Sequence, residues 1–292
     1  MDVVMSVKKI TDDITLPVEN VNEVFGGTAG NFTKIALKIS LPFRLYSIVS
    51  SISHNKYLDF LIEKGFDMNG IVISDDDFGP VCYAVNDGKE QRYFMAEGPM
   101  KRLSYRILDE KYDYLHLGTG NPELNYQLME GCSYERLSFD PSQEIFYKYS
   151  AEQIRDFMNR SDFIMGNENE IKFMKDRTGI DFKEIAGMGK IIVMTRGSSG
   201  CTVIGGSSFS VPAYGKVEDG DTLGAGDSFR AGFYYGLYNN LTLEESVACG
   251  NVVSYFVVLN GLNNFNVDGR RIIEMGKELS KKVIYHNGDL RI

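Results

Sequence analysis

The chain has 292 residues, which is enough for one large domain or for one domain with a small appendage. Hydrophobic residues make up 43% of it and charged residues 24%, which is ordinary for a protein that buries a core. The net charge of −9, without a block of Lys and Arg, argues against a nucleic-acid partner, because binding along a phosphate backbone needs a basic face.

The sequence predicts neither a membrane segment nor a metal-binding cysteine pattern. The longest apolar run, residues 252–259, is far shorter than a membrane span, and the N-terminus lacks a signal-peptide core. The cysteines and histidines are scattered without a Cys-x-x-Cys spacing, so we expect neither zinc nor a disulfide framework. We therefore expect a cytoplasmic protein with buried thiols and no membrane partner.

The N-terminal part combines a strand, a carboxylate and a glycine-rich helix start. Residues 3–7 are predicted as a strand, and Asp12 follows where this strand leads into a loop. Asp12 can face a ligand there, although a solvated turn carboxylate is the alternative. The segment Gly26-Gly-Thr-Ala-Gly-Asn31 then leads into a helix predicted over 32–38, either as a ligand site or as an ordinary helix entry.

A change of pattern follows a strand predicted over 45–51 and a helix predicted over 57–64. Three short stretches rich in β-branched and aromatic residues predict β-hairpins rather than alternating strands and helices: 71–73, 81–85 and 91–95. We expect them to form a small sheet that stands off the main fold, with a plain edge hairpin as the alternative.

From residue 112 onward, strand and helix signals alternate. Strands are predicted over 114–117, 137–140, 163–166 and 190–194, and helices over 123–130 and 151–160. This order predicts an α/β fold, a doubly wound and mostly parallel sheet with helices on both faces. Ligands of such sheets gather at the carboxyl ends of the strands, where four polar residues fall: Asp140, Asn167, Glu170 and Thr195.

Two of these strand ends carry short motifs. Asn167-Glu-Asn-Glu170 opens a helix, where polar residues taken alone serve as caps more often than as catalysts. Thr195-Arg-Gly-Ser-Ser-Gly200 follows the next strand, and its Gly197 and Gly200 permit a tight turn beside a nucleotide or a plain β-turn.

The segment from Asp221 to Phe233 carries the most specific motif of the chain. Gly224, Ala225 and Gly226 let the backbone approach a ligand closely, and the amphipathic run that follows places a helix N-terminus beside them. Such an end can hold a phosphoryl group through its amides and the helix dipole. Asp227 is interpreted as a general base that takes a proton from an attacking hydroxyl, and helix capping is the alternative.

A further helix is predicted from the capping box Thr242-Leu-Glu-Glu245 towards Leu259. Asn251 lies on this helix, where helix packing alone would account for it. The chain has no Walker loop and no Gly-x-Gly-x-x-Gly segment, so P-loop, protein-kinase and Rossmann chemistry are disfavoured.

The motif Asp221-Thr-x-Gly-Ala-Gly-Asp227, with Gly26, Gly27 and Asn31 earlier in the chain, resembles the signatures of the ribokinase family, also called the PfkB carbohydrate kinases. The resemblance implies one ribokinase-like α/β domain over 1–292, with a β lid contributed by roughly 8–18 and 70–97. It implies transfer of the γ-phosphoryl group of ATP to a hydroxyl of a sugar or nucleoside. Mg²⁺ is the implied cofactor, a monovalent cation such as K⁺ is an option, and the lid is an option for a homodimer surface.

The resemblance also assigns roles to individual residues. Asp227 is the implied base and Gly224, Ala225 and Gly226 form the anion hole, with substrate contacts from Asp12, Gly26, Gly27 and Asn31. The implied nucleotide-binding residues are Asn167, Thr195, Gly197, Gly200 and Asn251, and Glu170 helps to place the metal.

The chain departs from the family pattern at two places. Ser51-Ile-Ser53 stands where the family often has Gly-x-Asp, and Asp140-Pro-Ser-Gln-Glu144 replaces Asp-x-Asn-x-Arg. A ligand-binding or sensor protein that kept the fold and lost most catalysis is therefore the alternative function.

Overall fold

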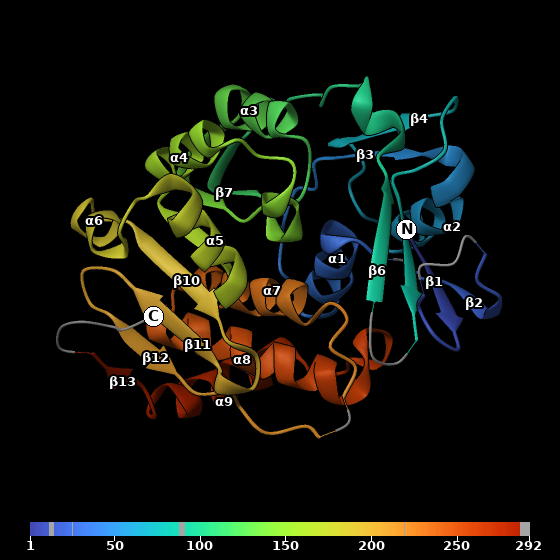
Figure 1. The fold of residues 1–292 in the computed structure, drawn as a ribbon. Coiled ribbons are helices and arrows are strands. Elements are labelled where there is room, and N and C mark those ends of the chain that lie inside the picture. The colour runs from blue at the N-terminus through green and yellow to red at the C-terminus, as the bar shows by residue number, and fades with distance from the viewer. Residues whose placement is uncertain (12–14, 25, 88–90, 219, 287–292) are drawn as a thin grey trace. The chain divides into compact units, whose positions relative to one another are not determined.

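The computed structural model of the chain describes residues 1–11, 15–24, 26–87, 91–218 and 220–286. The chain divides into two compact units, which Figure 1 shows in the colours of the chain order. The smaller unit comprises Met1–Gly30 and Arg44–Leu108, and the larger unit comprises Asn31–Phe43 and Asp109–Ile292.

The described part of the smaller unit holds a four-stranded sheet with the strand order β2-β1-β5-β6. β1 is antiparallel to β2 and parallel to β5, and β5 and β6 form an antiparallel hairpin. The strand predicted over 3–7 and the hairpin predicted over 81–95 are therefore confirmed. The four strands are β1 (Asp2–Val7), β2 (Val18–Val24), β5 (Val81–Asn86) and β6 (Gln91–Ala96).

The smaller unit also contains a parallel strand pair joined by a helix. β3 (Ser47–Ser50) pairs with β4 (Ile71–Ser74), and α2 (Ser51–Glu63) connects the two strands. The short helix η1 (Gly98–Lys101) follows β6. The prediction that residues 71–73 belong with the hairpins is therefore wrong, because these residues pair with β3 across a helical crossover. α2 begins six residues before the predicted start, because the Ser50 hydroxyl accepts a bond from the amide of Ile52 (3.0 Å) and caps the helix there.

The expected lid corresponds to this sheet only in part. β5 and β6 lie within residues 70–97, whereas β1 ends before residue 8 and β2 begins only at residue 18. Several large apolar side chains of β2 and β6 are exposed: Val18, Val21, Tyr93, Phe94 and Met95. The lid role of the sheet and a homodimer through it stay predictions.

The described part of the larger unit holds a seven-stranded sheet with the order β13-β12-β11-β10-β9-β8-β7. It is parallel from β7 to β10 and antiparallel from β10 to β13. The parallel strands are β7 (Lys111–Leu117), β8 (Ser133–Phe139), β9 (Phe163–Asn167) and β10 (Ile191–Thr195), and the others are β11 (Cys201–Ile204), β12 (Phe209–Val211) and β13 (Ile284–Tyr285).

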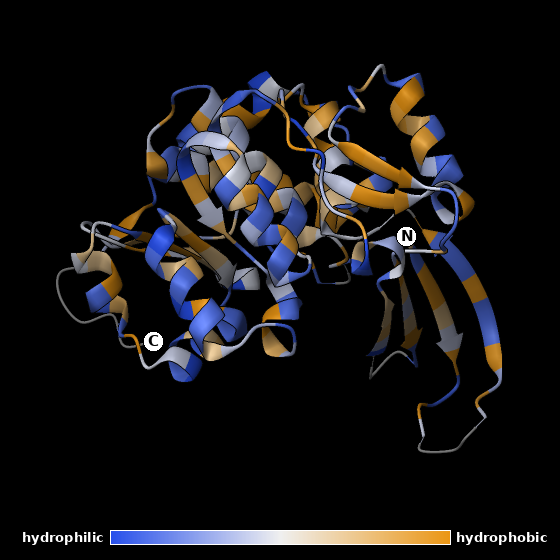
Figure 2. Ribbon diagram, turned by 90° about the horizontal axis from the view of Figure 1, so that it is seen from above, coloured by the Kyte–Doolittle hydropathy of each residue, from blue (hydrophilic) through white to orange (hydrophobic). Residues whose placement is uncertain are grey.

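Helices cover both faces of this sheet, as predicted. Figure 2 shows that the helices carry both hydrophilic and hydrophobic residues, which is typical of helices with one face on a core. The α-helices are α1 (Thr28–Lys38), α3 (Pro122–Gly131), α4 (Ala151–Arg160), α5 (Glu168–Thr178), α6 (Phe182–Gly187), α7 (Ala225–Tyr238), α8 (Leu243–Asn260) and α9 (Gly269–Ser280). Short 3₁₀ helices are η2 (Ser142–Phe146), η3 (Gly197–Ser199) and η4 (Leu262–Asn264).

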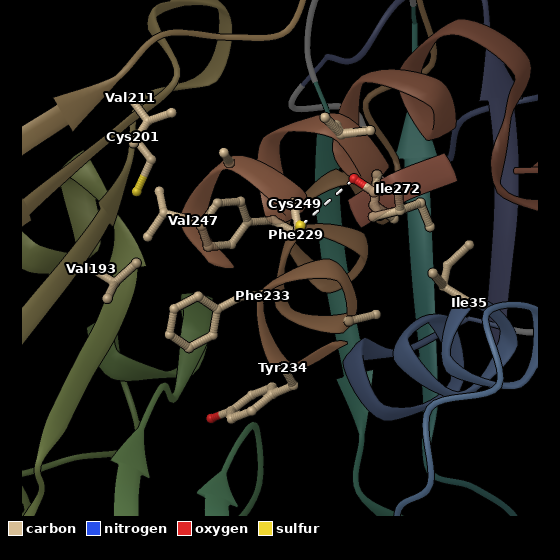
Figure 3. Close-up of a cluster of buried hydrophobic side chains, with 14 of the residues drawn as sticks. Ile35, Val193, Cys201, Val211, Phe229, Phe233, Tyr234, Val247, Cys249 and Ile272 are labelled. Atoms are coloured by element: carbon tan, nitrogen blue, oxygen red, sulfur yellow. Dashed lines mark hydrogen bonds between the residues drawn. The ribbon is translucent and has the colours of Figure 1, made fainter. Parts of the chain in front are cut away.

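The main core lies between one face of the sheet and the helices α1, α7, α8 and α9. Figure 3 shows Phe233 pointing from α7 towards Val193 on β10, and Phe229 lies in the same cluster. The thiol of Cys249 on α8 is buried in it and points at the carbonyl oxygen of Ile272 on α9 (3.7 Å). This packing holds α7, with its N-terminus, firmly against the sheet.

The opposite face is covered from the other side. Phe139 of β8 stacks on Phe157 of α4 with ring centroids 4.7 Å apart, and Tyr126 of α3 stacks on Phe157 at 4.4 Å. Alternation along each strand sends successive side chains to these two cores. The carboxyl ends of β7 to β10 are thereby fixed from both faces.

Candidate active site

α7 begins at a turn that requires glycine. Gly224 is the N-cap residue and has a φ of 72°, in the left-handed region that favours glycine. A Cβ at Gly224 would also lie 3.0 Å from Leu262 Cδ1 and 3.2 Å from Asn31 Nδ2, so the space around it is filled. The glycine at position 224 is therefore explained by both backbone conformation and close packing.

The first amides of α7 lie at the positive end of the helix dipole. The bond from Ser228 N–H to Gly224 O (2.9 Å) begins the helical pattern, and the amides of residues 225–227 come before it. Ala225 N–H donates to Thr222 O (3.2 Å) and closes the preceding turn. Because the N-cap is glycine, its residue offers no side chain to these amides, and the helix dipole favours negative charge at this end.

Asp227 lies at this helix end as a buried carboxylate. It is 6% exposed, and its two oxygens accept from different elements. Asn31 Nδ2 on α1 donates to Oδ2 (2.9 Å), and Arg230 Nη1 donates to Oδ1 (2.7 Å). Asp227 is the third residue of the helix and lies in its first turn, where an acidic side chain also interacts favourably with the helix dipole.

Arg230 connects Asp227 to the sheet, and the sequence analysis gave it no role. Its Nε and Nη2 donate to the two oxygens of Asp140 after β8, with 2.7 Å for the Nη2 bond. Its side chain is 11% exposed and that of Asp140 is 1% exposed. The signal was present in the sequence, because residues three apart on a helix share a face and Arg230 follows Asp227 by three.

Burial opposes the charge of Arg230, but the carboxylates of Asp140, Asp227 and Glu170 outweigh it and raise its pKa above the ordinary value. The pKa of Glu170 is also raised, first by burial and then by the charge of Asp140. Arg230 and an N–H bond act in the opposite direction on Glu170. These four groups therefore form one electrostatic neighbourhood.

Asn167 and Glu170 form a reciprocal capping box at the start of α5. Glu170 Oε2 accepts from Asn167 N–H (2.8 Å), and Asn167 Oδ1 accepts from Glu170 N–H (3.0 Å). The capping alternative is thus present in the structure. It leaves Glu170 4% exposed and close enough to Asp140 to feel its charge.

The segment after β10 forms a tight hairpin. Gly197 and Gly200 have φ values of 53° and 90°, and a Cβ at Gly200 would collide with the carbonyl oxygen of Val211. Thr195 ends β10, and Arg196 N–H donates to Gly200 O (2.8 Å). The plain β-turn explains these glycines, and their contact with a nucleotide stays a prediction.

Asn251 has structural partners on the larger unit. It is 7% exposed, and its Nδ2 donates to Val211 O (3.2 Å) and Pro212 O (2.9 Å). A Cβ at the neighbouring Gly250 would lie 2.7 Å from the ring of Phe229, so that glycine serves the contact of α8 with α7. Helix packing accounts for both residues, and a nucleotide role for Asn251 stays a prediction.

The other residues assigned to substrate divide between the two units. Asp12 lies outside the described residues. Gly26 and Gly27 lie in the smaller unit, where Gly27 N–H donates to Asp2 Oδ2 (3.1 Å) and a Cβ at Gly26 would overlap this carboxylate. Asn31 lies in the larger unit, where it contacts the predicted base.

The residues that replace the family pattern after β8 have local partners. Glu144 is buried, and its two oxygens accept from Gly120 N–H (2.5 Å) and from Lys148 Nζ (2.7 Å). It therefore ties the loop after β7 to η2. The guanidinium that contacts Asp140 comes from Arg230 on α7 instead of from this segment.

A second polar contact fixes α7 one turn further along. Tyr234 OH donates to Ser138 Oγ on β8 (2.7 Å) and lies 2.8 Å from His116 Nδ1 on β7. Burial lowers the pKa of His116 to about 4, so this ring is neutral at neutral pH.

Neither a protein-only metal cage nor a membrane span is found within the described ranges. There, no group of three or more His, Cys, Asp and Glu side chains is arranged to hold a metal ion. Mg²⁺ needs fewer protein ligands, because it keeps several waters and binds phosphates. Within the same ranges, no helix is both long and apolar enough to cross a bilayer.

The sequence is similar to those of known kinases over most of its length. The model of the pfkB family carbohydrate kinases matches residues 1–267. A nucleoside kinase of Thermoplasma acidophilum is 35% identical over 269 residues, covering 92% of this chain and 90% of that protein. A nucleoside kinase of Methanothermobacter thermautotrophicus is 25% identical over 256 residues, covering 82% and 80%.

Solved structures share the fold. A Thermoplasma acidophilum protein assigned as a ribokinase superposes with a TM-score of 0.83 at 33% identity, covering 96% of this chain and 95% of that chain. The nucleoside kinase of Methanocaldococcus jannaschii, described as an archaeal member of the ribokinase family, gives a TM-score of 0.84 at 22% identity, covering 95% of each chain. The ribokinase-like fold expected from the sequence is confirmed.

Proposed function

The chain belongs to the pfkB family of carbohydrate kinases, which transfer a phosphoryl group to an alcohol, and we propose that its acceptor is a nucleoside and its donor ATP. The observation that carries the chemistry is the buried Asp227 at the N-terminus of α7, held on one oxygen by Asn31 and on the other by Arg230. The nucleoside is favoured over a free sugar because relatives at 35%, 25% and 23% identity are named nucleoside kinases.

Asp227 is the proposed general base. Its two oxygens accept from Asn31 and Arg230, and a carboxylate oxygen held in this way is the kind of atom that can take the proton of a substrate hydroxyl. The proton of the acceptor hydroxyl passes to the carboxylate as the oxygen attacks the γ-phosphorus and the bond to ADP breaks. A positioned base contributes about 10²- to 10⁴-fold to such a step.

The amides of Gly224 to Asp227 are the proposed anion hole, and that of Ala225 would have to exchange its bond to Thr222 O for the anion. They precede the first helical hydrogen bond of α7, whose positive dipole end adds to their effect. Since phosphoryl transfer has a loose transition state, most of the rate enhancement comes from positioning and from charge stabilisation of this kind.

Glu170 is the proposed protein contact of Mg²⁺, largely through water. It is an ionisable oxygen donor beside Asp140 and Asp227, and this carboxylate-rich neighbourhood suits a hydrated divalent cation. Mg²⁺ would neutralise phosphate charge during transfer. The proposal also includes a monovalent cation such as K⁺ and a lid function for the small sheet. It further includes a homodimer formed through this sheet and a cytoplasmic location.

The proposal is tested by an acceptor panel with ADP formation as the readout. Purine and pyrimidine ribonucleosides are expected to give turnover, and ribose and fructose are expected to give much less. Asp227→Asn should lower turnover by about 10²- to 10⁴-fold while ATP still binds. Asp113→Asn, the same change at an exposed position of β7, is the control and should leave turnover unchanged.

The outcomes separate the alternatives. Near-wild-type turnover of Asp227→Asn would refute its role as the base, and turnover on free sugars alone would refute the nucleoside. Tight nucleoside binding without ADP formation from any acceptor would favour the sensor function over the kinase.

A further inference from the structure

We infer that Arg230 is a positioning residue, whose guanidinium bridges Asp140 and Asp227 and so fixes the carboxylate of the base to the sheet. The inference rests on the proposed function, in which Asp227 is the base. Arg230 reaches no reacting atom in it, and its effect passes through Asp227.

The geometry of the bridge sets the orientation of Asp227. Asp140 follows β8 directly, and its N–H donates to Leu117 O of the neighbouring β7 (2.9 Å), so its backbone belongs to the sheet. Arg230 binds both oxygens of Asp140 and uses its remaining Nη1 for Asp227 (2.7 Å). Because the guanidinium is planar and rigid, fixing one edge of it on Asp140 also fixes the direction of the third bond.

A second donor completes the placement from another element. Asn31 on α1 donates to the opposite oxygen of Asp227 (2.9 Å), so the carboxylate is held on both sides by groups from two helices. Its plane is thereby defined before substrate arrives. This is the kind of preorganisation that general-base catalysis needs, since a misplaced base loses much of its effect.

Burial argues that the bridge serves more than stability. The side chains of Arg230, Asp140 and Asp227 are 11%, 1% and 8% exposed, so solvent screens their charges little. Burying such a cluster costs desolvation energy that apolar side chains would avoid, so buried ion pairs are weak evidence for a gain in stability. Because burying these three charges costs desolvation energy, their presence at the start of α7 fits a role in positioning the base.

The departure from the family pattern points the same way. The segment Asp140-Pro-Ser-Gln-Glu144 lacks the arginine of Asp-x-Asn-x-Arg, and Glu144 is engaged with Gly120 and Lys148. Asp140 is nevertheless bound by a guanidinium, which comes from α7 and also contacts Asp227. Arg230 thus links Asp140 directly to the helix that carries Asp227.

The charges around Asp227 define what should happen when the bridge is removed. Arg230 on α7, Asp140 after β8 and Glu170 on α5 act on the charge of this cluster, and α1 contributes the neutral Asn31. The ring of His116 on β7 is near enough to Asp140 and Arg230 to interact with their charges, and burial keeps it neutral at neutral pH. Without the guanidinium, Asp227 would face two carboxylates. Neighbouring negative charge favours the protonated form of a carboxyl group, so the acid limb of the pH–rate profile should move to higher pH.

The test compares Arg230→Gln, Arg230→Lys and Asp140→Asn with the wild type. Arg230→Gln should lower kcat by about 10- to 100-fold, with KM for ATP and nucleoside changed by less than about 3-fold, and should raise the acid limb. Arg230→Lys keeps the positive charge but loses the planar guanidinium with its paired N–H donors. It should therefore have the acid limb of the wild type and only part of the wild-type kcat. Arg136→Gln, which breaks an exposed ion pair with Asp162, is the control and should change neither.

Asp140→Asn keeps the guanidinium beside Asp227 but weakens its anchor, so kcat should fall without a rise of the acid limb. If Arg230→Gln does not fold, Asp140→Asn still tests the positioning role through its kcat. An unchanged kcat in Asp140→Asn or Arg230→Gln, or equal increases in both KM values with an unmoved acid limb, would overturn the positioning role. Asp227→Asn in the same assay separates the two proposals, because its retained turnover would refute the base itself.

Discussion

The N-termini of α5 and α7 both belong to the larger unit, yet their N-caps differ. At α5, the side chains of Asn167 and Glu170 bond to each other's amides in a reciprocal box. At α7, the N-cap is Gly224, which has no side chain, and the acidic residue Asp227 is held by Asn31 and Arg230 instead.

The difference shows how one local pattern serves two purposes. The capping box of α5 satisfies the amides of Asn167 and Glu170 with each other's side chains, so fewer amides are left for an anion at this helix end. The glycine cap of α7 offers no side chain to its amides, so we propose that these amides meet a ligand and that Asp227 acts as the base beside them.

The largest effect is expected from giving α7 the cap that α5 has. Gly224→Asn should lower kcat by about 10²- to 10³-fold, because its side chain would compete for the amides and crowd Asn31 and Leu262. Gly179→Asn is the matched control, since Gly179 ends α5 with the same φ of 72° and has open space around it. Steady-state kinetics of both variants check the prediction, and equal effects would contradict it.

The next effect concerns the charge at α5. Glu170→Gln should lower kcat by about 10- to 100-fold and raise the Mg²⁺ concentration needed, while its amide oxygen can still cap Asn167. Glu245→Gln, at the same position of the capping box of α8, is the control and should change neither. An unchanged Mg²⁺ dependence of Glu170→Gln would contradict the metal role.

The same variant should be more stable than the wild type at neutral pH. The pKa of Glu170 is raised from about 4.5 in the folded protein, so the folded state keeps a proton that the unfolded chain releases. The stability of the wild type therefore falls as pH rises from about 4.5 through the folded pKa, whereas glutamine does not titrate. Denaturant unfolding at several pH values checks this, and a gap that does not widen with rising pH would contradict it.

Removing the other half of the α5 cap should have a smaller effect. Asn167→Ala should cost about 1 kcal/mol in the free energy of unfolding, because the amide of Glu170 loses its acceptor. Ser150→Ala breaks the equivalent box at α4 and should cost about the same. Only Asn167→Ala should also reduce turnover, and equal turnover in the two variants would contradict the special place of α5.

The smallest effect concerns His116, which contacts α7 through Tyr234. Its pKa is lowered to about 4 from an ordinary 6.5, so the wild type should lose stability as pH falls through this window, by at most about 1.4 kcal/mol per pH unit. His116→Gln should reduce that slope and leave turnover at neutral pH unchanged. His286→Gln, which loses a bond to Ser210, is the control in the same unfolding series, and an unaltered slope in His116→Gln would contradict the assignment.

The sequence predicted elements well where local signals and burial agree. The alternation from residue 112 onward placed the parallel strands and their helices, and α4 begins and ends at the predicted residues. The sequence analysis grouped β4 with the hairpin strands, although β4 pairs with β3. The residues of a short apolar strand do not show whether it pairs with a hairpin neighbour or with a strand on the other side of a helix.

The candidate site was predictable only where one motif contained it. Gly224 to Asp227 are contiguous, and their backbone demands can be read from glycine spacing. The contact between Asp140 and Arg230 joins residues that are 90 positions apart, and nothing in either segment alone specifies the other. Asn31 was predicted to contact substrate, and its bond to Asp227, 196 positions away, depends on the packing of α1 against α7.

Single-turnover phosphoryl transfer tests the central claim most directly. Excess enzyme is mixed with labelled ATP and a nucleoside, and labelled nucleoside phosphate is followed for the wild type and Asp227→Asn at equal occupancy by ATP. The account predicts transfer by the wild type and a rate lower by about 10²- to 10⁴-fold in the variant. Transfer by Asp227→Asn at the wild-type rate would contradict it.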